Sequence, residues 1–373
     1  MERSFATHSR IVNDLFAQYS NTFVAFCELI NNALQEGAKN IYIEIEQAKD
    51  EELTPLLVRK IVIKDDGNGV PESEFADRIL YIGTDAKPGG KGIGRFAAIQ
   101  IGSTVEIETV AYDSSINKYT KVILPITEEF FKKNKDVSKI TINTVDEVLE
   151  GKGNPYYQVT IKNLYSSIIT EREKKKKLDE NLLLQNIMNA IFVRYPIKIL
   201  NKEIRFYVNN SYLNPTDFVL GTPLKVKVDY IDKKENEYPI FLSYFNIKST
   251  LQDIKVFLTV KNAGIETIAA TFEFNAQWLS PKVGSWFVYI SSEMFTADML
   301  RNFDFGDLDE NGRHLRAFIK DQLNTFYKEK NKEFDDFKSK LRNDKYYPYK
   351  SIEATSNSKV IVFDKLAYLV EGK

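Results

Sequence analysis

The chain has 373 residues, 43% of them hydrophobic and 28% charged, with a formal net charge of −1. This length and composition suit two domains, and the near-neutral total gives no sign of a nucleic-acid or membrane partner, although a local basic face would be lost in the sum. The single cysteine, Cys27, excludes a disulfide framework. The first ten residues are polar and charged, unlike a signal peptide, and no apolar run approaches the roughly 20 residues that span a bilayer. We therefore expect a cytoplasmic protein with no membrane partner.

Residues 11–19 and 23–36 place apolar side chains at helical spacing, and Gly37 stands where the second helix would end. Alternating or wholly apolar runs then predict several strands, and a further helical pattern follows them. The strands are expected over 41–46, 61–65, 104–110, 138–144 and 157–163, and the helix over about 178–193. Because helices and strands mix without regular alternation, the pattern favours an α+β sandwich over a doubly wound sheet.

The character of the sequence changes at about residue 196, where short alternating segments predict a strand-rich α+β domain. The segments are EIRFYV, LKVKVDY, YPIFLSYF, IKVFLTV, ATFEF and SWFVYIS. A long amphipathic helix is expected after them, over about 311–341. The expected domains are therefore 1–195 and 196–345, followed over 346–373 by a tail or the start of a further domain, as in an N-terminal fragment of a longer protein.

The first motif that carries chemistry is Glu28-Leu29-Ile30-Asn31-Asn32-Ala33, on the second predicted helix. Positions i and i+4 share a helix face, so Glu28 and Asn32 project into the same space, whereas Asn31 is one residue off that face. A carboxylate there can deprotonate a water molecule, and an amide oxygen beside it can complete the oxygen shell of Mg²⁺. Taken alone, such a pair more often faces solvent on an ordinary helix.

The second motif, Asp65-Asp66-Gly67-Asn68-Gly69-Val70, follows directly on a predicted strand. A strand that ends on an acid and then two glycines suits a tight turn whose backbone comes close to a ligand. A buried carboxylate at this point could accept a hydrogen bond from an exocyclic amine such as that of adenine. A plain β-turn is the alternative, since Asp-Gly and Asn-Gly are common turn dipeptides.

The third motif is the segment from Gly83 to Arg95, which is rich in glycine and lysine. Its backbone N–H groups could hold phosphate oxygens, its lysines add positive charge, and its glycines allow the movement of a lid. It contains no Walker A pattern, and its glycines do not follow the first strand of a βαβ unit as a Rossmann fingerprint would. A flexible surface loop is the alternative.

The remaining polar features predict no site. The charge run at 171–177 indicates a solvated helix start or loop, with a phosphate- or DNA-facing patch as the minority alternative. His8 and His314 are the only histidines, and we expect both to be surface or structural residues. No cluster of metal ligands occurs in the sequence.

Each motif is ambiguous alone, but their order is specific. A helix with E-x-x-x-N, a strand, a strand ending in D-x-G-x-G and a G-x-G segment follow one another over about 20–110. This series resembles the GHKL superfamily of ATPases, which includes gyrase B, heat-shock chaperones, histidine kinases and MutL. The resemblance implies a Bergerat-type α/β sandwich that binds ATP and Mg²⁺.

The resemblance also assigns roles to the motifs. Glu28 matches the family's general base and Asn32 its Mg²⁺ ligand. Asp65 matches the acid that holds the adenine amine, with Gly67 and Gly69 making room for the ring. The third motif would supply the lid and the phosphate contacts. Its candidate residues are Thr84, Lys87, Gly90, Lys91, Gly92, Ile93, Gly94 and Arg95.

One position indicates which branch of the family the chain resembles, and two others differ from the family pattern. Histidine kinases usually have asparagine at the position of Glu28, so the glutamate favours hydrolysis over transfer of phosphate to a histidine. Gln35 stands where many members have an acid, three residues after the magnesium asparagine. Tyr157 aligns with a threonine that touches the adenine-binding water, and Thr160 lies three residues on with its side chain on the opposite face.

By resemblance, the second predicted domain corresponds to the transducer domain that follows the ATPase domain in gyrase B, MutL, the chaperones and the MORC proteins. A basic residue of that domain usually senses the γ-phosphate, and Lys282 and Lys350 are guesses for it. We expect a Mg²⁺-dependent ATPase similar to MORC-like and MutL-like members. Nucleotide binding would close the lid and drive formation of a homodimer that clamps DNA or a partner protein in a bacterial restriction or defence system. The alternative is a nucleotide-gated chaperone or protein-interaction module with little hydrolysis.

Overall fold

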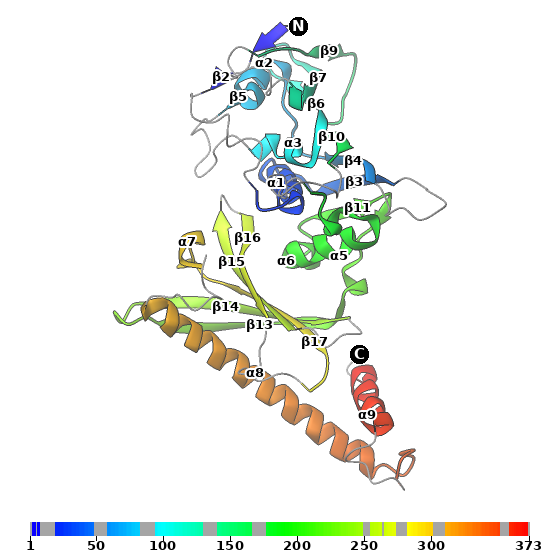
Figure 1. Ribbon diagram of the computed structural model, residues 1–373, viewed down its shortest axis with the longest axis vertical. Coiled ribbons are helices and arrows are strands. Elements are labelled where there is room, and N and C mark those ends of the chain that lie inside the picture. Colours follow the sequence, from blue (N-terminus) through cyan, green and yellow to red (C-terminus); the bar gives the residue numbers. More distant parts are fainter. Residues whose placement is uncertain are drawn as a thin grey trace. The chain divides into compact units, whose positions relative to one another are not determined.

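The computed structural model describes most of the chain (Figure 1). The described residues are 2–4, 6–7, 19–47, 58–82, 94–129, 140–165, 177–248, 254–262, 265–273, 282–300, 310–350 and 358–371. The chain divides into two compact units. The first is Met1–Pro215 with Ala263–Ile265, and the second is Thr216–Asn262 with Glu266–Lys373.

The first unit is built on an eight-stranded sheet in the order β12-β11-β3-β4-β10-β6-β7-β9. Its strands are β3 (Asn40–Gln47), β4 (Val58–Asp65), β6 (Gly102–Asp113), β7 (Lys118–Thr127), β9 (Val145–Leu149), β10 (Tyr156–Leu164), β11 (Arg205–Val208) and β12 (Ser211–Tyr212). Two short pairs accompany it, β1 (Glu2–Ser4) with β8 (Thr141–Asn143) and β2 (Ala6–Thr7) with β5 (Tyr81–Ile82). The mixed α+β class expected from the sequence is confirmed.

Helix α1 (Thr22–Gln35) is the element on which the candidate site depends. The Asn21 side chain caps it by accepting a hydrogen bond of 2.8 Å from the Val24 N–H. Most of its apolar side chains are buried, and those of Phe26 and Ile30 are completely so. Gly37 ends the helix in the left-handed region, at a φ of +83°. The helix predicted over 23–36 is therefore confirmed, whereas the one predicted over 11–19 lies almost entirely outside the described residues.

The other described helices of the first unit are shorter than α1. They are α2 (Glu72–Phe75), α3 (Ala98–Ile101), α5 (Leu184–Arg194) and α6 (Pro196–Leu200), with a π-helical turn at Ala76–Leu80 and 3-10 turns at Gly94–Phe96 and Glu180–Leu182. The predicted helix at 178–193 therefore begins as a 3-10 turn and becomes α-helical only at Leu184.

The sheet has one apolar and one polar face because its strands alternate. Ile41 and Ile43 of β3 and Ile61 and Ile63 of β4 are buried on one face, while the alternating positions, which face the other way, are Tyr42, Glu44, Lys60, Val62 and Lys64. β3 and β4 pair antiparallel in a register that sets Ile43 opposite Ile63. The buried isoleucines therefore form one continuous surface for the helices to cover.

The segment EIRFYV corrects the expected domain boundary. We expected it to open the second domain, but it forms β11, which pairs in parallel with β3 of the first sheet. Phe206 and Val208 are each 1% exposed, and the Asn209 side chain bonds both the N–H and the C=O of Ile45. Without β11, β3 would be an edge strand with unpaired backbone groups. The first unit therefore extends to Pro215 instead of ending at 195.

The second unit consists of a five-stranded sheet with a long helix on one face. The sheet order is β13-β14-β17-β15-β16. The strands are β13 (Val219–Ile231), β14 (Glu237–Ile247), β15 (Ile254–Asn262), β16 (Ile265–Glu273) and β17 (Ser285–Ser291), and a short helix, α7 (Ala297–Leu300), follows them. Helix α8 (Glu310–Asn343) packs Leu315, Ile319 and Leu323 into the sheet's core, and its Phe326 stacks on Tyr244 at 3.7 Å between ring centroids. The predicted helix over 311–341 is confirmed.

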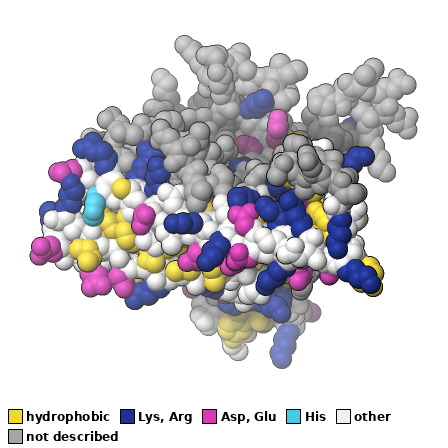
Figure 2. Space-filling model, turned by 90° about the horizontal axis from the view of Figure 1, so that it is seen from below, with side chains coloured by type: hydrophobic (Ala, Val, Ile, Leu, Met, Phe, Trp, Pro, Cys, Tyr) yellow, Lys and Arg dark blue, Asp and Glu magenta, His cyan; other side chains and the backbone are white. Residues whose placement is uncertain are grey.

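The exposed charge of the molecule is mixed in sign on the face drawn in Figure 2. Lys and Arg side chains are interspersed there with Asp and Glu side chains and with hydrophobic ones. This distribution agrees with the formal net charge of −1. Among the described residues of that face, no broad basic surface is seen.

The C-terminal stretch folds back on the second unit through a buried ion pair. Its apolar end forms helix α9 (Ser358–Glu371), which packs on α8. The Asp364 carboxylate is 1% exposed and accepts bonds from Arg342 (2.7 Å from Nη2) and from the Tyr347 hydroxyl (2.7 Å). A carboxylate is buried only where such partners replace its water. The pair therefore fixes α9 to the end of α8.

We predict that Asp364→Ala releases α9 without unfolding the rest of the unit. The substitution leaves the Arg342 guanidinium and the Tyr347 hydroxyl without their acceptor, and the cost to local stability should be about 2 kcal/mol, as for lost hydrogen bonds to a charged group. Hydrogen exchange of the α9 amides should accelerate accordingly, with the α8–sheet core unchanged. Lys365→Ala, on the same helix, serves as the matched control. Unchanged α9 protection in Asp364→Ala would contradict the assignment.

Candidate functional site

Glu28 and Asn32 occupy one face of α1, as the sequence predicts, and the backbone of Gly94 lies against both. A Cβ atom at Gly94 would come within 2.7 Å of Glu28 Oε1 and 3.3 Å of Asn32 Nδ2. Any larger residue would therefore displace the two side chains. The structure thus brings the first motif together with the end of the third, which are more than 60 positions apart in the sequence.

The Asn32 amide is a buried polar group that no described residue satisfies. Its Nδ2 atom has no hydrogen-bond partner among the described residues. A buried polar group without a partner costs about 1–3 kcal/mol. Asn and Gln amides can be turned over to suit their neighbours. This side chain is therefore available to a ligand, and it can present its oxygen to a cation.

Asp65 and Asp66 are adjacent but lie in opposite environments. Asp65 is 4% exposed, and among the described residues its carboxylate accepts only the Gly67 N–H, at 2.9 Å. Burial raises the pKa of Asp65 from 3.8 to about 7; the Gly67 N–H lowers it in part, and the charges of Asp66 and Glu36 raise it. The second carboxylate oxygen of Asp65 is left as an acceptor inside the fold. This is the chemistry that recognises a hydrogen-bond donor such as an amine.

Asp66, in contrast, is a structural residue of the turn. Its carboxylate accepts the backbone N–H groups of Lys39 and Asn40, both at 2.8 Å, and the Asn40 side-chain amide. Burial alone would raise the pKa of Asp66, but the donors from Asn40 and Lys39 hold it below its ordinary value. Asp66 therefore ties the turn after β4 to the start of β3, and Asp65 is the aspartate left for a ligand.

Gly69 is required because the turn packs directly on the sheet backbone. Its φ is +63°, and a Cβ atom there would overlap the Val110 carbonyl oxygen and lie 2.9 Å from that of Tyr156. Gly67 is similarly close to Asp65, with its ideal Cβ 2.8 Å from Oδ1. Both positions of the predicted turn therefore favour glycine, because other atoms lie within 3 Å of the place that a Cβ atom would take.

Thr109 is a residue of this site that the sequence did not lead us to expect. It is completely buried on β6, and its hydroxyl accepts the Val70 N–H at 2.8 Å and lies 3.2 Å from the Tyr156 carbonyl. It therefore anchors the exit of the Asp65–Val70 turn. A threonine on the inward-facing side of the strand TVEIETV was the available signal, since buried hydroxyls need partners.

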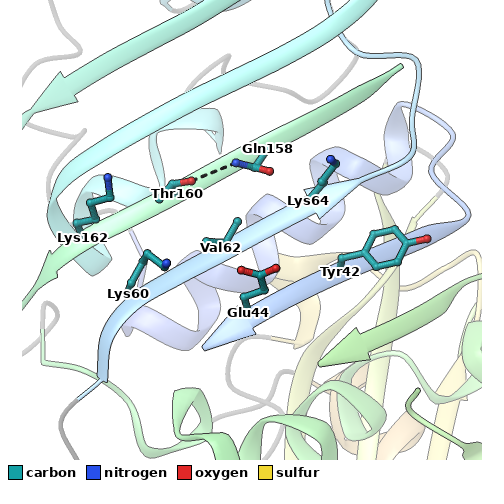
Figure 3. Close-up of a pocket in the computed structure, with 8 residues that line it drawn as sticks. All are labelled: Tyr42, Glu44, Lys60, Val62, Lys64, Gln158, Thr160 and Lys162. Carbon is teal, nitrogen blue, oxygen red and sulfur yellow. Dashed lines mark hydrogen bonds between the residues drawn. The ribbon is translucent and has the colours of Figure 1, made fainter. Parts of the chain in front are cut away.

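Tyr157 stands on β10 where the family often has threonine, and Thr160, the threonine nearby on the same strand, lies on the opposite face of the sheet. Tyr157 lies opposite Asp65 on one side and Thr109 on the other. Thr160 lines a hollow of about 290 Å³ on the polar face, as Figure 3 shows, with its hydroxyl 3.4 Å from Gln158 Nε2. The other residues of that hollow are Tyr42, Glu44, Lys60, Val62, Lys64 and Lys162. This hollow is therefore separate from the candidate site.

Much of the third motif lies outside the described residues. These undescribed candidates are Thr84, Lys87, Gly90, Lys91, Gly92 and Ile93. Arg95 belongs to the 3-10 turn Gly94–Phe96, but its side chain is outside the description.

Other predicted features have local partners or are likewise undescribed. His8 and nearly all of the 171–177 charge run lie outside the described residues. The ring of His314 lies 3.0 Å from the Tyr230 hydroxyl. Lys282 pairs with Asp335 on α8. Among the described residues, no group of His, Cys, Asp and Glu side chains could hold a metal ion by itself.

The raised pKa of Asp65 predicts how stability depends on pH. Between pH 4 and 7 the folded chain holds a proton on Asp65 that the unfolded chain has lost, so this residue makes stability fall by about 1.4 kcal/mol per pH unit as pH rises. Above pH 7 its effect is constant. Asp65→Asn should remove this slope and stabilise the nucleotide-free protein at pH 8, as measured by denaturant unfolding. Asp66→Asn is the control and should destabilise it; equal pH slopes in wild type and Asp65→Asn would contradict the prediction.

The comparison with known families agrees with this geometry. Residues 19–153 match the family model described as "Histidine kinase-, DNA gyrase B-, and HSP90-like ATPase". The matched segment contains α1, the Asp65 turn and Gly94. No curated protein matches the chain. Among the described residues, no helix has both the length and the apolar character of a membrane span. The first unit of this chain therefore contains an ATPase domain of the GHKL superfamily.

Proposed function

We propose that this protein is a Mg²⁺-dependent ATPase in which Glu28 activates the attacking water. The carrying observation is the approach of Gly94 to Glu28 and Asn32. It brings together a carboxylate, an amide nitrogen with no partner among the described residues, and the start of a backbone turn. A carboxylate can take a proton from water, and a glycine backbone lets phosphate oxygens come close. Glutamate at position 28 supports hydrolysis over phosphoryl transfer.

The adenine end of the nucleotide is assigned to Asp65. Its buried carboxylate has an oxygen without a donor among the described residues, which suits the exocyclic amine of adenine. The left-handed turn at Gly69 keeps side chains away from the sheet backbone at this end. The third motif would supply the phosphate contacts, through Thr84, Lys87, Gly90, Lys91, Gly92, Ile93, Gly94 and Arg95.

The residues present fit a magnesium ion that is shared with the phosphates. Asn32 would hold it through its amide oxygen, and its other ligands would be phosphate oxygens and water, the usual arrangement for Mg²⁺ at a nucleotide. Bound there, the ion would neutralise negative charge on the phosphates. Asn32 itself orients the ligand oxygen from a rigid helix.

We predict that Glu28→Gln binds ATP normally but hydrolyses it at least about a hundredfold more slowly, because general-base catalysis contributes about that much. The amide keeps the shape of the side chain and cannot accept the proton. ATP affinity by calorimetry and the single-turnover rate with labelled ATP would measure the two effects. Glu72→Gln, on α2, is the matched control. Hydrolysis at the wild-type rate by Glu28→Gln would contradict the assignment of Glu28 as the general base.

We also predict that Asp65→Asn loses nucleotide affinity by about tenfold or more at pH 8, where the Asp65 carboxylate is ionised. In the variant the Gly67 N–H would bond the amide oxygen, so the NH₂ group would face the adenine amine in place of an acceptor. Adenosine and ADP titrations would measure this, since neither depends on hydrolysis. Retention of wild-type affinity would count against the adenine assignment.

We further propose that nucleotide binding closes a lid and drives dimerisation of the first unit, as a clamp on DNA or a partner protein. The second unit, a sheet with the long helix α8 on one face, would act as a transducer in the manner of MORC-like and MutL-like ATPases, in a restriction or defence setting. Two observations support this step: the order of the two units along the chain, and the build of the second unit, a five-stranded sheet with a long helix. Sedimentation with a non-hydrolysable ATP analogue tests the dimer.

A nucleotide-gated chaperone or interaction module with little hydrolysis is the alternative. On the face drawn in Figure 2, Lys and Arg side chains are interspersed with Asp and Glu, and such a face suits a protein client better than the phosphate backbone of DNA, which binds basic surfaces. In this case ATP would act as a conformational ligand that binds the closed state better. Single-turnover assays with and without double-stranded DNA separate the two: stimulation by DNA supports the clamp, and negligible turnover in both supports the module.

A further inference from the structure

A buried chain of hydrogen bonds leads from α5 to the Glu28 carboxylate. The Tyr195 hydroxyl lies 3.0 Å from Asn31 Oδ1 and 3.1 Å from the Cys27 carbonyl oxygen, so it donates to one of them at a time. Asn31 in turn donates from Nδ2 to Glu28 Oε2, at 3.4 Å. Tyr195 and Asn31 are 3% and 7% exposed. This chain lies on the interior side of Glu28.

The bond from Tyr195 decides which way the Asn31 amide faces. Because the amide oxygen accepts from the hydroxyl, the NH₂ group is turned toward Glu28. Tyr195 is itself fixed by burial and by its ring, which stacks on Phe206 of β11 with centroids 5.8 Å apart. The donor to Glu28 is therefore held by the sheet and not by α1 alone.

The two oxygens of the Glu28 carboxylate consequently have different surroundings. Oε2 accepts from Asn31 on the inner side, while Oε1 is the atom nearest to the Gly94 position, 2.7 Å from its ideal Cβ. A carboxylate anchored at one oxygen cannot rotate freely about its last bond. The free oxygen stays directed at the backbone where phosphates are proposed to lie.

We infer that Asn31 and Tyr195 are positioning residues for the general base: they hold Glu28 Oε2 so that Oε1 faces the attacking water. This inference rests on the proposed function. The sequence alone assigns Asn31 no role, because this residue lies one position off the helix face that Glu28 and Asn32 share. Neither residue needs to touch the nucleotide for this role.

The test is a pair of substitutions measured in two backgrounds. Asn31→Leu keeps a similar volume and removes both bonds, while the Tyr195 hydroxyl retains the Cys27 carbonyl. We expect kcat to fall by about tenfold, as for loss of a hydrogen bond to a charged group, with KM for ATP and the affinity for ADP unchanged. Tyr195→Phe keeps the ring and should lower kcat by about threefold, as for one neutral bond. In the Glu28→Gln background both substitutions should leave the residual rate unchanged.

The last comparison separates positioning from a general structural effect. A residue that acts only through Glu28 has nothing to act on once Glu28 is glutamine. Tyr230→Phe removes a hydroxyl that bonds His314 in the second unit, and it serves as the matched control, with no expected change in kcat. Melting temperatures verify folding, and if Asn31→Leu does not fold, Tyr195→Phe carries the same cycle.

The outcomes distinguish this inference from the proposed function. If the wild-type protein does not hydrolyse ATP, the proposed function fails and the positioning role falls with it. If the wild type is active and Glu28→Gln is not, yet Asn31→Leu and Tyr195→Phe keep the wild-type kcat, the positioning role alone is overturned. An equal loss in the Glu28→Gln background, or a loss confined to KM and ADP affinity, would also overturn it.

Discussion

The close approach of the Gly94 backbone to α1 is the constraint on which the proposed nucleotide site depends. Glu28 and Asn32 project from a helix whose opposite side is locked into the core by completely buried residues such as Phe26 and Ile30. A Cβ atom at position 94 would come within 2.7 Å of Glu28 Oε1, so glycine lets the backbone approach without displacing that side chain. The result is a polar point enclosed by a rigid helix on one side and a turn on the other. A functional site gains precision when its residues stand on such elements.

The second constraint is electrostatic, and it costs stability. Burial raises the pKa of Asp65 to about 7, which means that the folded protein tolerates its charge poorly. Its neighbour Asp66 has three donors and the opposite shift. A fold selected only for stability would satisfy both carboxylates in the same way. The uneven distribution of donors is therefore a sign of function, because a ligand can supply what Asp65 lacks.

The sequence predicts those parts of the site that follow from local periodicity. The i and i+4 spacing sets Glu28 and Asn32 on one face, which the structure confirms. The glycines after β4 predict a turn close to a ligand; the structure shows a tight turn close to the sheet backbone, and the approach to a ligand stays a prediction. Thr109 could not be found in this way, because its role comes from a partner on another strand. The direction of the Asn31 amide is set by Tyr195, more than 160 positions away. Long-range hydrogen bonds leave no period in a sequence.

The same limit explains the misplaced domain boundary, and the correction bears on catalysis. An alternating segment looks the same whichever sheet it joins, so EIRFYV gave no indication that it pairs with β3. A boundary at 195 would separate Tyr195 from Phe206, the ring on which it stacks, and would leave β3 as an edge strand. Tyr195 also bonds Asn31, the donor to the Glu28 carboxylate. β11, which keeps β3 from being an edge strand, thus also supports, through Tyr195, the residue proposed to activate water, and it belongs to the same unit as Glu28.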